Sequence, residues 1–310
     1  MDTIVNRPTL DDMDLSLGKR TRLHRMLHEH GPGGSTMLVL PVDQGLEHGP
    51  RDFFENPDSL DPTYELDLAA KAGYSAIALQ VGLASKYMRP YAGTVPLLLK
   101  INGKSEIPVN DSPRSPLTSR VEDAVRMGAD AIGYTLYVGS GAQEADFETF
   151  SQVRLEAERV GMPVVVWSYP RGDDIGDKGG AGSIYAIDYA ARIAAELGAD
   201  VVKVNYPDSN DDGTIGPVAD APAPYNKMTW TLEEALAKIL ESAGKTMVIM
   251  SGGSRVSDEL LLERVDASLK AGATGFIFGR NIWQRPHADA ATVVGRIKDR
   301  MRNYAKELGA

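Results

Sequence analysis

The sequence has 310 residues, of which 43% are hydrophobic and 25% are charged, as in an ordinary globular protein. Its formal net charge of -10 argues against a general nucleic-acid-binding protein, because such proteins need a basic face. The chain contains no cysteine, which excludes disulfides, thiol catalysis and cysteine-ligated metal sites.

The N-terminal part of the chain predicts neither export nor membrane insertion. Residues 1–17 lack a basic region followed by an apolar core, so they do not predict a secretory signal. No stretch approaches the roughly 20 apolar residues of a membrane span. We therefore expect a cytoplasmic protein with no membrane partner. Residues 9–30 predict a helical segment that either caps the bottom of the main fold or packs on a neighbouring subunit.

A single pattern recurs along the rest of the chain. An amphipathic helical stretch ends at a glycine, and a short apolar run follows, as in KAGYSAIALQ at 71–80 and KAGATGFIFG at 270–279. Glycine ends a helix well because it tolerates positive φ. Short, almost wholly apolar runs are typical of parallel strands that are buried on both faces. Eight such strands are predicted: 37–43, 75–80, 96–101, 130–135, 163–169, 200–205, 246–251 and 274–279.

Strict alternation of these strands with helices predicts an α/β fold with a parallel sheet. Eight strands in this length favour a closed (β/α)8 TIM barrel over an open, doubly wound sheet. No GxGxxG follows the first strand, which disfavours a dinucleotide-binding sheet. We divide the chain into an N-terminal helical extension, residues 1–35, and a single barrel domain, residues 36–310.

One connection of the predicted barrel is unusually long. Residues 206–229 follow the sixth strand and are rich in proline, glycine and aspartate. A loop of this length in a compact domain is usually functional or disordered. Because the loops that follow barrel strands form the active-site face, we expect this loop to lie over that face.

Lys203 is the most informative polar residue at the carboxyl end of a predicted strand. In the sixth strand, alternation places Lys203 on the same face as Val201 and opposite Val202, so its side chain points into the barrel. Burial disfavours an ammonium ion, and a neutral amine can attack a carbonyl group. The alternatives are a lysine paired with a carboxylate and a lysine that reaches out of the barrel mouth.

Lys100, at the end of the third strand, has the same character. It could lower the pKa of Lys203 through its charge, form the Schiff base itself, pair with Asp43, or bind the substrate.

Further polar and aromatic residues end neighbouring strands. Tyr169 and Trp167 share one face of the fifth strand, so Tyr169 could shuttle a proton at Lys203 and Trp167 could form a wall that positions the substrate. Asp43 ends the first strand, where a carboxylate can accept a proton or hold a hydroxyl group. His48 and Glu47 follow in the next loop, and a group of histidine, glutamate and aspartate raises the question of a metal site. The spacing matches no strong metal-binding motif, and we count His48 as a substrate ligand. We expect no metal and no cofactor.

Two glycine-containing loops end the last two strands. Ser251, Gly252 and Gly253 follow the seventh strand, and Gly279 and Arg280 follow the eighth. Barrels commonly bind phosphate at this place through backbone N–H groups, and glycine lets the backbone approach closely. Arginine can donate two hydrogen bonds to a phosphate, which Arg280 and, from the fifth strand, Arg171 could do. The sequence therefore predicts a phosphorylated substrate.

Several of these motifs together resemble those of the archaeal-type class I fructose-bisphosphate aldolases, a family that also occurs in bacteria. The resemblance covers about residues 37–290 and rests on PVDQGLEHGP, WSYPRG, VVKVNYP, the SGG of MSGGS and FGRNIWQ. It implies reversible cleavage of fructose 1,6-bisphosphate to dihydroxyacetone phosphate and glyceraldehyde 3-phosphate. Many members form large rings, which implies a homo-oligomer and suggests a decamer.

The resemblance also implies a role for each site residue. Lys203 would form the Schiff base, Tyr169 would be the main proton shuttle, Asp43 would assist dehydration or hold a hydroxyl group, and Trp167 would position the substrate. The phosphate of the dihydroxyacetone-phosphate half would be bound by Ser251, Gly252, Gly279, Arg280 and Arg171.

Two other functions fit the same residues. One is a related Schiff-base lyase or transferase that acts on another phosphorylated keto compound through the same lysine. The other is a non-catalytic barrel that binds sugar phosphates.

Overall fold

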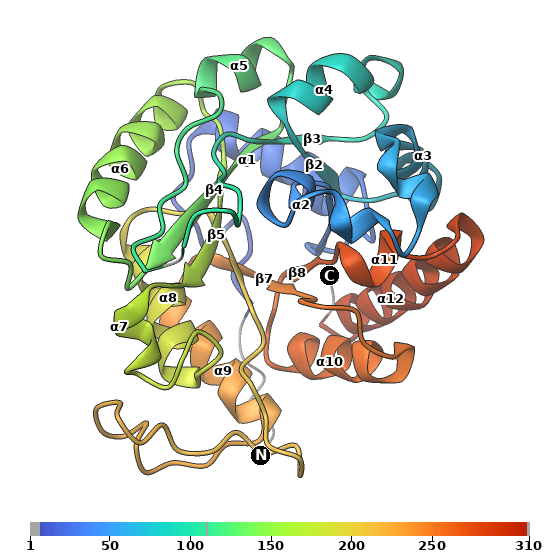
Figure 1. The fold of residues 1–310 in the computed structure, drawn as a ribbon. Coiled ribbons are helices and arrows are strands. Elements are labelled where there is room, and N and C mark those ends of the chain that lie inside the picture. Colours follow the sequence, from blue (N-terminus) through green and yellow to red (C-terminus); the bar gives the residue numbers. More distant parts are fainter. Residues whose placement is uncertain (1–6, 110, 309–310) are drawn as a thin grey trace.

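The computed structural model describes residues 7–109 and 111–308 and shows the predicted barrel (Figure 1). Eight parallel strands pair in sequence order, and β8 pairs with β1 to close the sheet. The α/β fold class and all eight strands are thus confirmed. The strand ends differ slightly from the prediction, and β4 continues three residues further, to Val138. The strands are β1 Met37–Pro41, β2 Ala76–Gln80, β3 Leu97–Lys100, β4 Ala131–Val138, β5 Val164–Pro170, β6 Val201–Val204, β7 Met247–Ser251 and β8 Gly275–Ile277.

Helices surround the sheet on its outer side, as Figure 1 shows. Most of the longer ones begin with a residue that caps the helix. Asp61, Ser183, Thr231 and Ser257 each accept a hydrogen bond from a backbone N–H of the first turn. The α-helices are α1 Leu17–His24, α2 Gln44–Glu47, α3 Pro62–Ala72, α4 Val81–Tyr87, α5 Val121–Arg126, α6 Gln143–Arg159, α7 Asp173–Gly176, α8 Ile184–Glu196, α9 Leu232–Ala243, α10 Asp258–Lys270, α11 Arg280–Trp283 and α12 His287–Glu307. Within the described ranges, no helix has both the length and the apolar character needed to cross a bilayer.

The two faces of the strands pack in different layers. On β6, Val202 and Val204 belong to the large cluster between sheet and helices, whereas Val201 belongs to a second cluster inside the barrel. Val165 and Trp167 on β5 also belong to the interior cluster. This alternation places Lys203 inside the barrel, as the sequence predicts.

The N-terminal helical segment closes the bottom of the barrel. Helix α1 continues into a π-helical turn, Arg25–Glu29, and Leu23 and Met26 join the cluster inside the barrel. Lys19 pairs with Asp200 just before β6, with 3.0 Å between Nζ and Oδ2. Of the two predicted arrangements for this segment, capping of the barrel is confirmed. The helix begins later than predicted, and the domain division at residue 35 stays a prediction that in part concerns residues 1–6, outside the described ranges.

The long loop after β6 lies at the active-site face only at its start, where residues 206–209 line a pocket together with residues 251–254, so the prediction is wrong for the rest of the loop. Figure 1 shows it, in gold, projecting outward beside α9. Ile215, Val218 and Ala221 are buried against Ile184 of α8 and Ala235 of α9. The loop is polar on average, but its few apolar side chains bury outside the barrel and draw it away from the barrel mouth.

A buried carboxyl group on α3 leads to a testable prediction. Glu65 is fully buried, and neither of its side-chain oxygens has a hydrogen-bond partner among the described residues. Burial raises the pKa of Glu65 to about 9. The folded protein therefore keeps the proton at neutral pH while the unfolded chain releases it, so this group lowers the free energy of unfolding as the pH rises toward 9.

We expect Glu65→Gln to stabilise the protein at pH 8 by roughly 1–3 kcal/mol, because the buried group no longer takes up a proton on folding. The gain should shrink at pH 5. Urea unfolding at the two pH values measures it, with Glu241→Gln, at an exposed position of α9, as the matched control. Equal stability of Glu65→Gln and the wild type at both pH values would contradict the prediction.

Candidate active site

A cavity of about 320 Å³ opens at the carboxyl ends of the strands. Its wall includes Asp43 after β1, Tyr169 on β5 and Lys203 on β6. Glycine-containing loops after β7 and β8 form another part of the wall. Polar residues from strands far apart in sequence are thus brought together at the end where barrel enzymes carry out their chemistry. The predicted site residues that line it are Asp43, His48, Tyr169, Arg171, Lys203, Ser251, Gly252, Gly253, Gly279 and Arg280.

Lys203 lies in this cavity with only 6% of its surface exposed. Its Nζ donates a hydrogen bond to the Tyr169 hydroxyl group and lies 5.4 Å from the centre of the Trp167 ring. It forms no ion pair with a carboxylate in the part of the chain that the structure describes. Burial lowers the pKa of Lys203 to about 8, even though two nearby carboxylates act in the opposite direction. A substantial fraction of this amine is therefore neutral near physiological pH, as a nucleophile requires.

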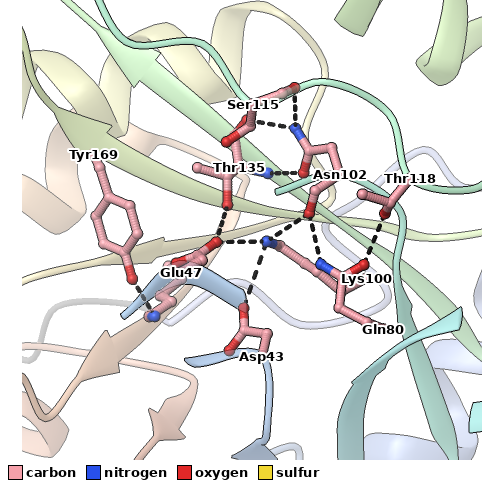
Figure 2. A network of polar contacts seen from close by, with 10 residues as sticks. Asp43, Glu47, Gln80, Lys100, Asn102, Ser115, Thr118, Thr135 and Tyr169 are labelled. Carbon is pink, nitrogen blue, oxygen red and sulfur yellow. Dashed lines mark hydrogen bonds and ion pairs between the residues drawn. The ribbon is translucent and has the colours of Figure 1, made fainter. Parts of the chain in front are cut away.

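Lys100 is the buried lysine that does pair with carboxylates. Its Nζ lies 3.1 Å from Oε1 of Glu47 and 3.4 Å from Oδ2 of Asp43, and it donates to the Asn102 carbonyl oxygen at 3.2 Å. Figure 2 shows these contacts. Burial would lower the pKa of Lys100, but Glu47 and Asp43 outweigh that effect and raise it. Lys100 does not line the cavity, so its predicted contact with substrate stays a prediction, and the predicted pairing with Asp43 is present.

The two aromatic residues of β5 lie at different depths. Tyr169 lines the cavity, and burial together with Glu47 and Asp43 raises the pKa of its hydroxyl group well above the usual value. Trp167 is fully buried below the cavity and does not line it. Its ring lies 5.2 Å from Nζ of Lys100 and 5.4 Å from Nζ of Lys203. In this structure Trp167 thus touches the two lysines rather than forming the substrate wall that the sequence analysis expects.

The loop after β7 is shaped for close approach of a ligand to its backbone. A side chain at position 252 would lie 2.7 Å from Asn281 and 2.9 Å from Phe278, so only glycine fits there, and Gly253 has a φ of +62°. Asn281 donates from Nδ2 to the Gly252 carbonyl oxygen at 3.1 Å and accepts from the Val256 N–H at 2.9 Å. These bonds hold the β7 loop against the loop after β8.

The cavity is rich in cations. Arg171, Arg280 and Lys104 line it, and none of the three forms an ion pair with a carboxylate in the described part of the chain. His48 lies at the same rim, and its Nδ1 is 2.8 Å from Oδ2 of Asp52. Cations without carboxylate partners, beside a glycine loop, suit an anionic ligand. Among the described residues, no group of three or more carboxylate, imidazole or thiol side chains could hold a metal ion.

Seven cavity residues were not predicted as site residues: Pro41, Glu47, Lys104, Glu106, Tyr137, Asn205 and Ile277. Glu47 and Lys104 are charged, and a sequence signal existed for each of them. Glu47 directly precedes His48, and Lys104 directly follows the LKING segment at 99–103. Neither lies on a strand, so strand alternation gives no direction for their side chains.

A model of the DeoC/LacD family of aldolases matches residues 37–285, most of the chain. The chain belongs to this family. Its members are aldolases, which confirms the predicted reaction class. The match spans all eight strands, from β1 to α11, and includes every predicted site residue.

Relatives of this DeoC/LacD aldolase agree with the predicted resemblance to class I fructose-bisphosphate aldolases. It is 42% identical over 252 residues to fructose-bisphosphate aldolase class 1 of Thermoproteus tenax, an alignment that covers 81% of this chain and 84% of the relative. It is 34% identical over 265 residues to fructose-bisphosphate aldolase/6-deoxy-5-ketofructose 1-phosphate synthase of Methanocaldococcus jannaschii, covering 82% of this chain and 77% of that protein.

A solved structure gives the same relationship in three dimensions. It is an archaeal fructose-1,6-bisphosphate aldolase whose catalytic lysine is covalently bound to the carbinolamine intermediate of the substrate. The two structures superpose with a TM-score of 0.76 at 36% sequence identity, over 91% of this chain and 98% of that chain.

Proposed function

We propose that this aldolase is a class I fructose-bisphosphate aldolase that works through a Schiff base on Lys203. It reversibly cleaves fructose 1,6-bisphosphate to dihydroxyacetone phosphate and glyceraldehyde 3-phosphate. The observation that carries the proposal is the Lys203 amine, which lies in the cavity, is hydrogen-bonded to Tyr169 and has no carboxylate ion pair in the described part of the chain. The class 1 name of the Thermoproteus tenax relative and the lysine-bound intermediate of the archaeal enzyme support it.

The reaction begins with attack of the Lys203 amine on the C2 ketone. The resulting carbinolamine loses its oxygen as water when Tyr169 donates a proton to it, which leaves an iminium ion beside a tyrosinate. The tyrosinate then takes the proton of the C4 hydroxyl group. The electron pair of the C3–C4 bond moves to the iminium, so the bond breaks and an enamine and glyceraldehyde 3-phosphate form. Protonation of the enamine and hydrolysis release dihydroxyacetone phosphate.

The raised pKa of Tyr169 suits this sequence, because the free enzyme then holds the proton that the dehydration step needs.

Two sets of cavity-lining residues suit the two phosphate groups of this substrate. The phosphate of the dihydroxyacetone half binds at the backbone of residues 251–253 and Gly279, with the guanidinium groups of Arg280 and Arg171. The other phosphate binds toward His48 and Lys104. Arg171, Arg280 and Lys104 support this assignment, because in the described part of the chain they form no carboxylate ion pair that a dianionic phosphate would have to replace. Asp43 lies beside Lys100 and is placed to hold a substrate hydroxyl group.

We expect kcat/KM for cleavage to rise with pH, and we expect the midpoint of this rise to lie near pH 8. Below that pH Lys203 is protonated and cannot attack the ketone, and above it the amine is neutral. Initial rates at low substrate concentration between pH 5.5 and 9.5 measure the midpoint. A midpoint near pH 10, where an ordinary solvated lysine loses its proton, would contradict a buried and activated amine.

A second candidate is a Schiff-base enzyme that acts on another phosphorylated keto compound. The name of the Methanocaldococcus jannaschii relative includes a second activity, 6-deoxy-5-ketofructose 1-phosphate synthase, and this supports the second candidate. Cleavage rates for fructose 1,6-bisphosphate and fructose 1-phosphate distinguish the two. The proposal expects kcat/KM at least about tenfold higher for the bisphosphate, since one phosphate contact is worth 1.4 kcal/mol or more. The reverse ranking favours the second candidate, and binding of both compounds without turnover favours a non-catalytic barrel.

We also propose that the protein is a homo-oligomer, and the family resemblance suggests a decamer. Large apolar side chains on the surface of the single chain support an assembly, and the most exposed are Leu17, Phe54, Leu60, Ile107 and Val109. Sedimentation velocity tests this point, and a single species of 33.4 kDa at micromolar concentration would contradict it. The expected cytoplasmic location stays a prediction.

A further inference from the structure

Glu47 has no part in the mechanism above, yet it lies at the centre of the polar network below the cavity (Figure 2). It is the last residue of the short helix α2, directly after β1, and only 14% of its side chain is exposed. Its Oε1 accepts a hydrogen bond from Nζ of Lys100 at 3.1 Å and another from the hydroxyl group of Thr135 at 3.3 Å. One carboxylate oxygen therefore connects α2 with β3 and β4.

A rigid frame holds the partners of Glu47 in place. Asn102 accepts from the Thr135 N–H at 2.7 Å and donates to the Thr135 carbonyl oxygen at 2.8 Å. The Asn102 carbonyl oxygen in turn accepts from Lys100 at 3.2 Å and from Gln80 at 2.9 Å. Lys100, Asn102 and Thr135 are all fully buried. Buried polar groups that satisfy one another in this way fix a single arrangement of their side chains.

The two active-site lysines differ in their partners. Nζ of Lys100 has Glu47, Asp43 and the Asn102 carbonyl oxygen within 3.4 Å, which suits the three hydrogens of an ammonium group. Nζ of Lys203 has one hydrogen-bond partner in the described part of the chain, the Tyr169 hydroxyl group. Both amines lie near the same Trp167 ring. Since each is buried, the carboxylate contacts decide which of the two carries the charge.

We propose that Glu47 is a positioning residue that holds Lys100 as a permanent ammonium below the cavity, so that Lys203 is the lysine that reacts. This inference rests on the proposed Schiff-base function. The ammonium of Lys100, held between Glu47 and Asp43, offsets one of their two negative charges at Lys203. Without that offset, two carboxylates would favour the protonated form of Lys203.

Four charged side chains from different elements act on the Lys203 amine. They are Asp43 after β1, Glu47 on α2, Lys100 on β3 and Arg280 after β8. The neutral Tyr169 hydroxyl group on β5 accepts its hydrogen bond. The carboxylates favour the protonated form of Lys203, and the two cations favour the neutral amine. Each substitution in the network therefore has a defined sign. Removal of a carboxylate should shift the rising limb of the kcat/KM profile to lower pH, and removal of Lys100 should shift it to higher pH.

The test is a double-mutant cycle read out by the pH profile. Lys100→Met should move the rising limb up by about one pH unit and lower kcat/KM at pH 7.5 by up to about tenfold, because two carboxylates are then left without their cation. Glu47→Gln should move the limb down. The double variant, Glu47→Gln with Lys100→Met, removes one charge of each sign, so its limb should return toward the wild-type position and its kcat/KM should exceed that of Lys100→Met alone. A double variant whose limb stays at the position found for Lys100→Met, and whose kcat/KM is no higher than that of Lys100→Met, overturns the inference.

Two further variants keep the test decisive. Glu106→Gln removes a carboxylate at the cavity rim that pairs with Arg51, and the rising limb of its kcat/KM profile should keep the wild-type midpoint. Thr135→Val removes the hydroxyl group that contacts Glu47 and no charge, so its limb should also stay in place. If Lys100→Met does not fold, the pH profile of Glu47→Gln alone tests the inference. A rising limb of kcat/KM that stays at the wild-type pH or moves to higher pH in this variant contradicts it. This inference alone is rejected if the wild type cleaves the substrate, Lys203→Met does not, and the pH profiles of Glu47→Gln and Lys100→Met keep the wild-type midpoint. The proposed function is rejected if the wild type itself does not cleave the substrate.

Discussion

Replacement of Lys203 by methionine is expected to lower kcat for fructose 1,6-bisphosphate cleavage by at least about 10⁴-fold, or roughly 5.5 kcal/mol of barrier. The C3–C4 bond can break only if its electron pair has an acceptor, and the iminium formed with Lys203 is the proposed acceptor. Methionine is unbranched and of similar length, so it fills the space of the lysine side chain in the cavity wall. The fold should persist, because the substitution also removes the cost of burying an amine.

A matched control separates loss of the nucleophile from loss of a buried lysine. Lys298 on α12 is also buried, and it donates hydrogen bonds to two backbone carbonyl oxygens, those of Ala72 and Gly73. Lys298→Met should reduce the melting temperature and leave kcat within about threefold of the wild type. Cleavage that persists within tenfold in Lys203→Met would contradict the assignment. Loss of Schiff-base formation in Lys100→Met instead would move the covalent role to Lys100.

Replacement of Tyr169 by phenylalanine is expected to lower kcat by about 10²–10³-fold and to slow Schiff-base formation as well, because carbinolamine dehydration and C4 deprotonation both lose their proton shuttle. General acid–base groups typically contribute factors of this size. The Tyr169 hydroxyl group is the hydrogen-bond partner of the Lys203 amine, so its loss removes the proposed proton shuttle. The phenylalanine ring keeps the packing and the contact with the Arg171 guanidinium, which lies 5.4 Å from the ring centre. Single-turnover cleavage, measured beside the fraction of enzyme trapped as adduct, separates the two steps.

Tyr134→Phe is the control for this second prediction. The Tyr134 hydroxyl group is buried behind β4 and donates to Oδ1 of Asp146 at 2.6 Å, away from the cavity. Its loss should cost about 1 kcal/mol of stability and leave kcat nearly unchanged. A kcat of Tyr169→Phe within threefold of the wild type would contradict the proton-shuttle role. A trapped fraction equal to that of the wild type, with single-turnover cleavage slowed, would limit Tyr169 to the C4 deprotonation.

The parts of the site that lie on strands could be predicted from the sequence. A strand has a side-chain period of two, so the valines around Lys203 were enough to place it inside the barrel. The order of the strands then brought Tyr169 next to Lys203, because consecutive strands of a barrel are neighbours. Glycine in the loop after β7 was informative for a similar local reason, since a side chain at position 252 does not fit.

Features set by contacts between distant segments could not be predicted in this way. The partners of Lys100 come from β1, α2 and the chain after β3, and no local pattern shows that Glu47 turns inward. Depth within the barrel was equally hidden, so Trp167 was expected at the cavity wall and lies below it. The loop after β6 looked like an active-site loop by composition. Its position depends on a few apolar contacts of Ile215 and Val218 with α8 and α9.

Borohydride trapping is the most direct measurement of the covalent mechanism. The protein is incubated with dihydroxyacetone phosphate, reduced with sodium borohydride, digested and mapped by mass spectrometry. We predict a reduced adduct on Lys203 and, in the Lys203→Met variant treated in parallel, no adduct on Lys100. An adduct on Lys100 in the wild type would contradict the assignment of the nucleophile. The absence of any adduct, from a preparation that cleaves fructose 1,6-bisphosphate, would contradict the Schiff-base mechanism itself.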